Sequence, residues 1–130
     1  MTKVTASMTI DSWNEEGFAA AGEVSLAQAD SPASFTGDLQ GSSTVRTLLT
    51  YPTSAAPSFV ALQAFEGTVL SKSGSVVLQQ LGTFKNNAAH VELSVVPGSG
   101  TGELEGVSGS GSYIAPSGEP VISVTLDLEF

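Results

Sequence analysis

The chain has no cysteine, few charged residues and no long apolar run, and each of these absences narrows the class of protein. Without cysteine it forms no disulfide, thiolate nucleophile, cysteine-ligated zinc site or iron–sulfur cluster. No apolar stretch approaches the roughly 18 residues that span a bilayer. Residues 1–7 do not have the pattern of a signal peptide, so we expect a cytoplasmic protein.

Basic residues are scarce as well. The 130 residues include four Lys and Arg against 13 Asp and Glu, which gives a formal net charge of −9. A surface of this charge repels phosphate backbones and anionic lipids, so we expect neither nucleic acid nor membrane as a partner. The acidic side chains are interpreted as a solvated surface that confers solubility.

The remaining composition favours strands and turns. Apolar residues make up 41% of the chain and charged residues only 13%, which argues against disorder, and 14 glycines supply turns. The length predicts a single domain, residues 1–130, that can build one sizeable core.

Short apolar runs separated by turn residues organise the chain. Apolar and polar residues alternate most clearly at Val4–Trp13 and Val121–Phe130. We expect a turn at Asn14–Gly17. Residues 18–29 fit either a strand or a short helix, and a strand there would break near Pro32.

Three hairpin-like units follow, and then a glycine-rich segment at Pro97–Gly111 whose middle fits one helical turn. Consecutive strands joined by short turns form an antiparallel meander, and about eight strands usually close, which removes exposed edges. The predicted fold class is therefore all-β, a small closed antiparallel β-barrel of about eight strands.

The turns predict which side chains face the barrel interior, because a hairpin turn sets the register of its strands. A turn centred on Lys72-Ser73 pairs Phe65 with Gln80 and places Gln63 opposite Gly82, where the missing side chain leaves space. A turn centred on Asn86-Asn87 continues the pattern. The interior then includes a set of apolar and amide side chains: Gln63, Phe65, Gln80, Phe84 and Leu93.

The loop at residues 52–57 is longer than the two hairpin turns, so it defines the register between the strands on either side of it less precisely. Our best pairing turns Thr47 and Tyr51 inward and Arg46 outward near Glu66. A shift of one residue would instead turn Arg46 inward, where it could bind a ligand carboxylate. The predicted exterior also includes Lys85, His90 and Asp127.

Motifs for catalysis or metal binding are weak or absent. Gly98–Gly102 has neither the G-x-G-x-x-G spacing nor the following Lys-Ser/Thr pair of a phosphate-binding loop, so we interpret it as a tight structural loop. No G-x-S-x-G elbow occurs. His90 shares a strand face with Glu92, but two such ligands are a weak signal, so we expect no metal and no cofactor.

One long segment resembles a known family. Ser58–Phe84, SFVALQAFEGTVLSKSGSVVLQQLGTF, is similar to a family of small bacterial proteins of unknown function, and the similarity recurs at Ser34–Gly41, in VVPGSGTGELEG at Val95–Gly106 and at Thr125–Leu128. The resemblance implies the calycin-like barrel of plant allene oxide cyclase, which binds an unsaturated epoxide and steers its cyclisation.

Relatives in this family often carry Glu and His where this chain has Gln63 and Gln80, which argues against an acid–base role at these positions.

Two functions are then possible. In the first, the barrel binds a small, largely apolar molecule, with candidate contacts from Gln63, Gln80, Tyr51, Thr47, Phe65, Phe84 and Leu93. In the second, it is an isomerase or cyclase of the allene oxide cyclase type that acts by shape-templating.

A packed structural barrel without ligand is the third alternative. We favour the binding protein, because the sequence indicates a pocket and no catalyst.

Two features stay open in the sequence. Trp13 and Tyr113 lie either at the barrel mouth or in ordinary packing. Apolar residues on the outer face, such as Val60 and Leu62, leave a homo-dimer or homo-trimer open.

Overall fold

The computed structural model describes all residues, Met1–Phe130. The chain forms ten strands and one short 3₁₀ helix: β1 (Thr2–Ile10), β2 (Asn14–Ala21), β3 (Val24–Asp30), β4 (Ala33–Gly37), β5 (Leu39–Tyr51), β6 (Ser58–Val69), β7 (Lys72–Lys85), β8 (Ala88–Val95), η1 (Gly102–Leu104), β9 (Ser108–Pro116) and β10 (Val121–Glu129). No helix in the structure has the length and apolar character to cross a membrane.

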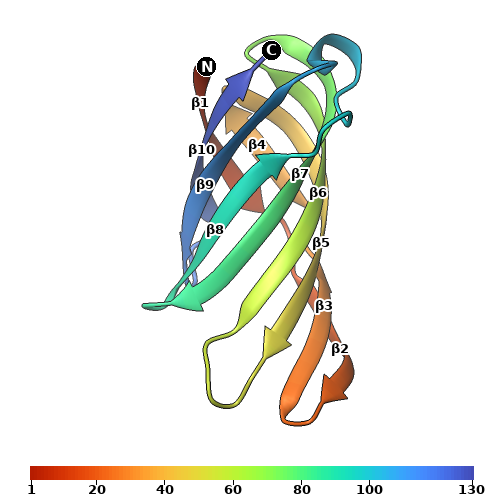
Figure 1. Cartoon of the computed structure of the whole chain (residues 1–130). Coiled ribbons are helices and arrows are strands. Elements are labelled where there is room, and N and C mark those ends of the chain that lie inside the picture. Colours follow the sequence, from red (N-terminus) through yellow and green to blue (C-terminus); the bar gives the residue numbers. More distant parts are fainter.

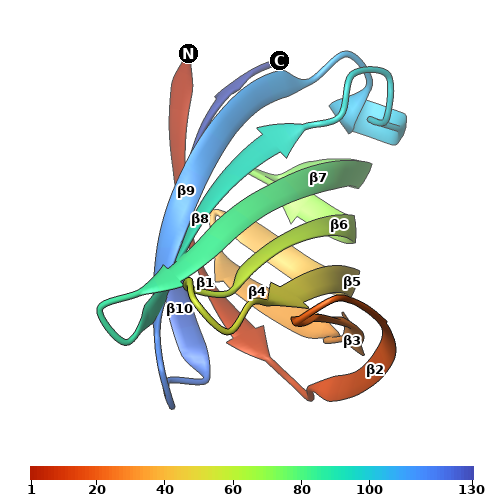
Figure 2. The ribbon, with the colours of Figure 1, turned by 60° about the horizontal axis from the view of Figure 1, so that its bottom comes forward.

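Eight of the strands form a closed antiparallel ring. Around the ring the order is β5, β6, β7, β8, β9, β10, β1 and β4, and β4 pairs again with β5. Figure 1 shows the tilted strands from the side, and Figure 2 shows the ring with the lower end turned forward. This ring confirms the predicted closed barrel of about eight strands.

The other two strands form a hairpin that extends the wall below the ring (Figure 1). β5 is long enough to pair with β4 through Gly41–Ser43 and with β3 through Arg46–Tyr51. The break between β3 and β4 falls at Ser31 and Pro32, as predicted, and the Ser31 amide still donates to Val45 O at 3.0 Å. The turn predicted at residues 14–17 is wrong, because these residues begin β2 and pair with β3.

β9 is a strand that the sequence analysis did not identify. Its segment SGSGSYIAP has the composition of a loop, yet it pairs with β8 on one side and β10 on the other. A Cβ on Gly111 would collide with the backbone oxygen of Thr125 on the neighbouring strand. The glycine therefore serves close strand packing, which composition alone does not distinguish from a turn.

The register between β6 and β7 differs from the predicted one by four residues. The turn is centred on Leu70 and Ser71, both at positive φ, so Gln63 lies opposite Leu78 and not opposite Gly82. The space beside Gly82 is filled by the ring of Phe59. Because four is an even number, every side chain keeps its predicted face.

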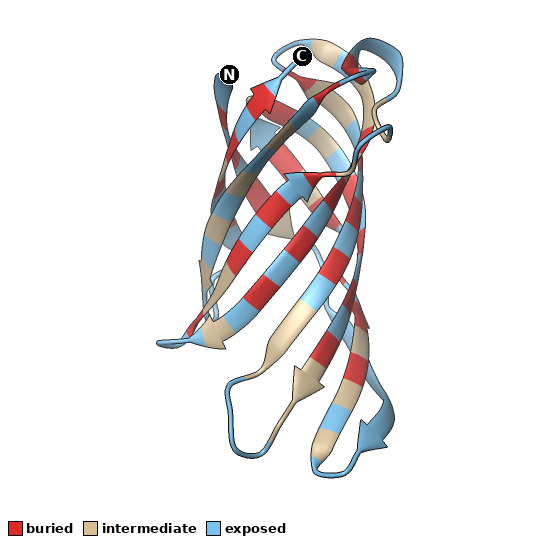
Figure 3. Cartoon of the chain, in the orientation of Figure 1, coloured by how far each residue is buried: buried red, intermediate tan, exposed pale blue.

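The register between β7 and β8 is the predicted one. Asn86 and Asn87 both have positive φ and form the turn, and Gln80 pairs with Leu93. Burial alternates along these strands (Figure 3). Phe65 and Leu93 are buried as predicted.

The end of the barrel next to η1 is solidly packed. Nine apolar side chains meet there and leave a void of only about 10 Å³: Leu39, Val69, Val76, Leu78, Val95, Leu104, Val107, Leu126 and Leu128. Leu104 and Val107, from η1 and the residues after it, are both buried and plug this end. Space for a ligand therefore has to lie at the opposite end.

Candidate functional site

The half of the barrel opposite η1 contains a cavity of about 640 Å³. Twenty residues line it, and 12 of them are hydrophobic; the apolar wall includes Met8, Ile10, Val45, Leu49, Phe59, Phe84 and Ile122. The lining continues to exposed residues at the mouth, among them Trp13 and Gly118–Glu119. The barrel is thus a cup, closed at the η1 end and open at the other.

A chain of hydrogen bonds crosses the barrel interior beside this cavity. The Tyr113 hydroxyl donates to Gln80 Oε1 at 3.0 Å, and Gln80 Nε2 donates to Gln63 Oε1 at 2.9 Å. Gln63 Nε2 in turn donates to Ser43 Oγ at 2.9 Å, and Ser43 Oγ donates to the Ala33 carbonyl at 3.1 Å. Five strands, β9, β7, β6, β5 and β4, are linked in this way.

The two glutamines in this chain have different surroundings. Gln63 is 1% exposed, uses its oxygen and its nitrogen within the protein, and does not line the cavity. Gln80 lines the cavity, and its Nε2 has a second hydrogen beyond the one donated to Gln63. Burial raises the pKa of Tyr113, so its phenol stays a neutral donor at physiological pH.

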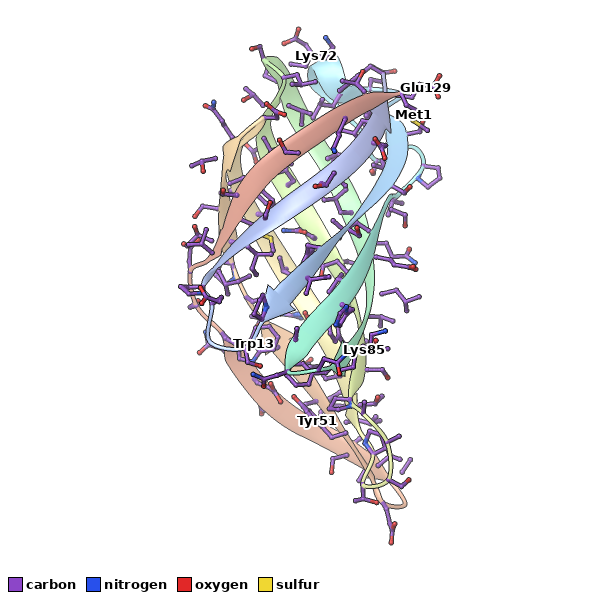
Figure 4. All side chains as sticks on the ribbon, turned by 90° about the vertical axis from the view of Figure 1, so that its left-hand side faces the viewer. Met1, Trp13, Tyr51, Lys72, Lys85 and Glu129 are labelled. Carbon is purple, nitrogen blue, oxygen red and sulfur yellow. The ribbon has the colours of Figure 1, made fainter.

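A second polar group lies at the cavity mouth. The carboxylate of Glu15, on β2, accepts from Trp13 Nε1 at 2.9 Å through one oxygen and from the Tyr51 hydroxyl at 2.6 Å through the other. Burial, followed by the hydrogen bond and negative charge of Glu15, raises the pKa of Tyr51 to about 12. Figure 4 shows Trp13 and Tyr51 toward the end of the molecule away from Lys72.

The structure brings four of the candidate contact residues to the cavity, namely Thr47, Tyr51, Gln80 and Phe84. The other three, Gln63, Phe65 and Leu93, are buried but lie outside its lining. Phe84 was expected in the core and is instead half-buried, because it stands at the open end where the cavity replaces packed side chains.

Phe65 belongs to the packed interior. Its ring meets the ring of Phe35 edge to face, with 5.4 Å between the centroids and 85° between the planes. This contact joins β6 to β4 over the intervening strand β5, and Phe65 belongs to the main core cluster.

Sequence reasoning missed Ser31 and Glu15. Ser31 is 2% exposed and lines the cavity, but it lies in the break between two strands, where no hairpin turn sets a register. Glu15 was interpreted as one of the solvated acidic residues. Its role at the mouth depends on the pairing of β2 with β3, and the segment had been expected to be a turn.

The two candidates for charge-based binding lie on the outer face. Arg46 Nε contacts Asp30 Oδ1 at 2.9 Å and not Glu66, since the β5–β6 register places Arg46 opposite Leu62. His90 is half-buried rather than exposed, and its Nε2 is enclosed without a hydrogen-bond partner. The structure contains no group of three or more His, Asp or Glu side chains arranged to hold a metal ion.

The glycine-rich loop is bonded to the barrel wall. The Thr101 amide donates to Ser75 O at 2.9 Å, and the Ser99 hydroxyl accepts from the Val77 amide at 3.1 Å. These bonds secure the loop that carries η1 to β7, as expected for a tight structural loop.

The comparisons with known proteins cover the whole barrel. The family model described as "Protein of unknown function (DUF3224)" matches residues 4–128. A protein of unknown function from the same family, from Shewanella oneidensis MR-1, has a crystal structure that is similar to this chain with a TM-score of 0.77 and 27% identity, over 100% of this chain and 99% of that chain. The curated proteins include no match.

Proposed function

The chain belongs to the DUF3224 family of proteins of unknown function, and on that premise we propose that its barrel binds one small, largely apolar molecule. The observation that carries the proposal is the cavity of about 640 Å³ with 12 hydrophobic residues in its lining. Its size falls within the roughly 300–1,000 Å³ of ligand pockets, and such pockets combine apolar walls with a few polar groups.

The contrast between the two ends of the barrel supports this proposal. The η1 end is filled by large aliphatic side chains that leave a void of only about 10 Å³. At the open end the paired residues Ala89 and Ala115 both line the cavity and take up little of its volume. The same eight-stranded barrel is thus packed solid at one end and hollow at the other, which argues against the packed-barrel alternative.

The isomerase or cyclase alternative has one observation in its favour. Gln80 and Tyr113 present oriented dipoles in an apolar cavity, and such groups can stabilise charge that develops in a transition state. The lining contains no histidine, and its one carboxylate, Glu119, lies at the exposed mouth. Catalysis would therefore depend on shape and dipoles rather than on proton transfer near pH 7.

The test is a fluorescence titration with N-phenyl-1-naphthylamine, a neutral apolar probe. Trp13 is the sole tryptophan and lines the cavity, so bound probe should quench it by energy transfer. We expect saturable binding that Ala115→Phe weakens by about tenfold or more, equivalent to about 1.4 kcal/mol. The matched control is Ala64→Phe, because Ala64 is exposed on the outer face of β6.

Absence of saturable binding to the wild-type protein would overturn the proposal. Equal weakening by both variants would place the probe elsewhere. Native mass spectrometry of freshly purified protein then detects a bound molecule, and chromatography before and after incubation with the protein separates the two functions, because isomers have the same mass. A bound molecule that is released unchanged supports binding, and one that is released as a rearranged isomer supports catalysis.

A further inference from the structure

The charge of the cavity limits what it can hold. Of the 20 lining residues, only Glu119 carries a charge at neutral pH, and no Lys, Arg or His is among them. The two tyrosines in the lining have raised pKa values and stay neutral. A buried anion would therefore have no cationic partner, and burying an unpaired charge is strongly unfavourable.

Negative charge at the cavity mouth also disfavours the entry of anions. Glu15 and Glu119 both stand there, and the chain as a whole has a net charge of −9. An anionic molecule would have to pass these carboxylates before it reached the apolar wall. Both oxygens of Glu15 accept hydrogen bonds, from Trp13 and Tyr51, which hold this carboxylate at the mouth.

The cavity nevertheless contains polar groups with unused hydrogen-bonding capacity. Thr47 is 3% exposed and Ser31 is 2% exposed, and neither hydroxyl has a hydrogen bond within the protein. They face the cavity from neighbouring positions, since Thr47 pairs with Ala29 and the Ser31 amide bonds to Val45 O.

Gln80 supplies a further donor to the same wall. Thr47, Ala61 and Gln80 are paired in one row across β5, β6 and β7, and the small side chain of Ala61 leaves the two polar groups facing one space. Buried polar groups are normally hydrogen-bonded. Two hydroxyls and a spare amide hydrogen are therefore available to bond with a molecule in the cavity.

We infer that the ligand is an uncharged molecule with an apolar body and a hydroxyl or carbonyl group, and that the cavity rejects carboxylates. This inference rests on the proposed function and specifies its ligand class. A carbonyl or hydroxyl oxygen accepts from the Thr47 and Ser31 hydroxyls and from Gln80 Nε2, while the remainder of the molecule contacts the aliphatic and aromatic wall.

The test compares four ligands of one shape by isothermal titration calorimetry: naphthalene, 2-naphthol, 2-acetonaphthone and 2-naphthoate. We expect 2-naphthol and 2-acetonaphthone to bind about tenfold more tightly than naphthalene, and 2-naphthoate at least about tenfold more weakly than 2-naphthol. The preference should be the same at pH 6 and pH 8, because the lining contains no histidine and the raised pKa values keep both of its tyrosines neutral.

A pair of variants assigns the preference to the polar wall. Thr47→Val removes one hydroxyl without changing the shape of the side chain, and it should reduce the preference for 2-naphthol over naphthalene. Thr44→Val is the control, since Thr44 is exposed on the outer side of the same strand. Circular dichroism and the thermal midpoint verify that both variants are folded.

The possible failures are distinct. If none of the four ligands binds and N-phenyl-1-naphthylamine does not bind either, the proposed function is wrong. If naphthalene binds as tightly as 2-naphthol, or 2-naphthoate binds as tightly as both, the cavity binds apolar molecules but the inference about polarity is wrong. An equal effect of Thr47→Val and Thr44→Val would also overturn it.

Discussion

Gln80 Nε2 lies 2.9 Å from Gln63 Oε1, so two neighbouring strands are joined inside the barrel by a hydrogen bond between buried amides. Tyr113 and Ser43 extend this bond on either side into a chain, and Gln63 Nε2 also donates to Met8 Sδ at 3.6 Å. The chain separates the packed half of the barrel from the hollow half. We therefore expect substitutions of its members to have non-additive effects on the free energy of unfolding.

The first prediction concerns this pair. Gln63→Leu leaves Gln80 Nε2 without its acceptor, and an unpaired buried group costs about 1–3 kcal/mol. The Ser43 hydroxyl keeps its bond to the Ala33 carbonyl. Gln80→Leu likewise leaves Gln63 Oε1 unpaired. We expect the double variant to lose less stability than the sum of the single losses, as measured in a double-mutant cycle by urea unfolding. Strictly additive losses would show that the amides act independently.

The second prediction separates the core from the cavity wall. Phe65 is 1% exposed and packs on Phe35, so Phe65→Ala should cost about 3–5 kcal/mol. Phe84 is half-buried, and one side of its ring faces the cavity instead of packed side chains. Phe84→Ala should therefore cost less than half as much. Chemical denaturation of the two variants under identical conditions measures both values, and a larger loss for Phe84 would contradict the assignment.

The third prediction concerns Tyr51 and Glu15. The chain has two tyrosines, so Tyr113→Phe leaves Tyr51 as the single phenol to titrate. Its absorbance should change with a midpoint near pH 12, and adding Glu15→Gln should lower that midpoint toward 10, the ordinary value. An unchanged midpoint would show that Glu15 does not contact Tyr51 in solution.

The same pKa has a consequence for stability. An unfolded chain loses the Tyr51 proton near pH 10 and the folded chain only near pH 12. The contribution of this group to stability is therefore complete below pH 10 and is lost as the pH rises through that window. Tyr51→Phe should make the unfolding free energy fall less steeply between these two values.

A fourth prediction concerns self-association, which stays a prediction from the exposed apolar residues. Leu48, Val60 and Leu81 form a row on the outer face of β5, β6 and β7, and all three are 45% exposed or more. Arg46 lies near one end of the row and Glu92 beyond the other. A twofold axis through the row would bring these opposite charges together, so we expect a dimer.

Light scattering at high micromolar concentration measures the assembly. Leu81→Glu should shift the protein to a monomer, whereas Val121→Glu should not, since Val121 is equally exposed but lies on β10, away from the row. A monomeric wild-type protein would contradict the prediction.

The inward and outward faces were predictable from the sequence because they depend on alternation alone. The β6–β7 turn was misplaced, which moved the partner of Gln63 from Gly82 to Leu78, yet both glutamines remained inside. Their shared face allows the hydrogen bond between Gln63 and Gln80. An error of an even number of residues in the register changes which residues lie opposite each other, but every side chain stays on the same face of the sheet.

The location of the cavity along the barrel was not predictable in the same way. It depends on which end η1 plugs and on the strand formed by Ser108–Pro116, whose composition is that of a loop. Gln63 and Gln80 have the same predicted face, but only Gln80 reaches the cavity, because depth along the barrel depends on the shear of all eight strands. The mouth contact of Glu15 likewise required the tertiary pairing of β2.

The most direct test of the account uses the three isoleucines of the chain. Ile10 and Ile122 line the cavity, whereas Ile114 is 56% exposed on the outer face. The protein is labelled with ¹³C at the isoleucine δ1 methyl groups, the signals are assigned by single Ile→Val variants, and N-phenyl-1-naphthylamine is added. Ring currents from a ligand in the cavity should shift the Ile10 and Ile122 signals and leave Ile114 unchanged. A shift confined to Ile114, or no shift at saturating probe, would contradict a binding site inside the barrel.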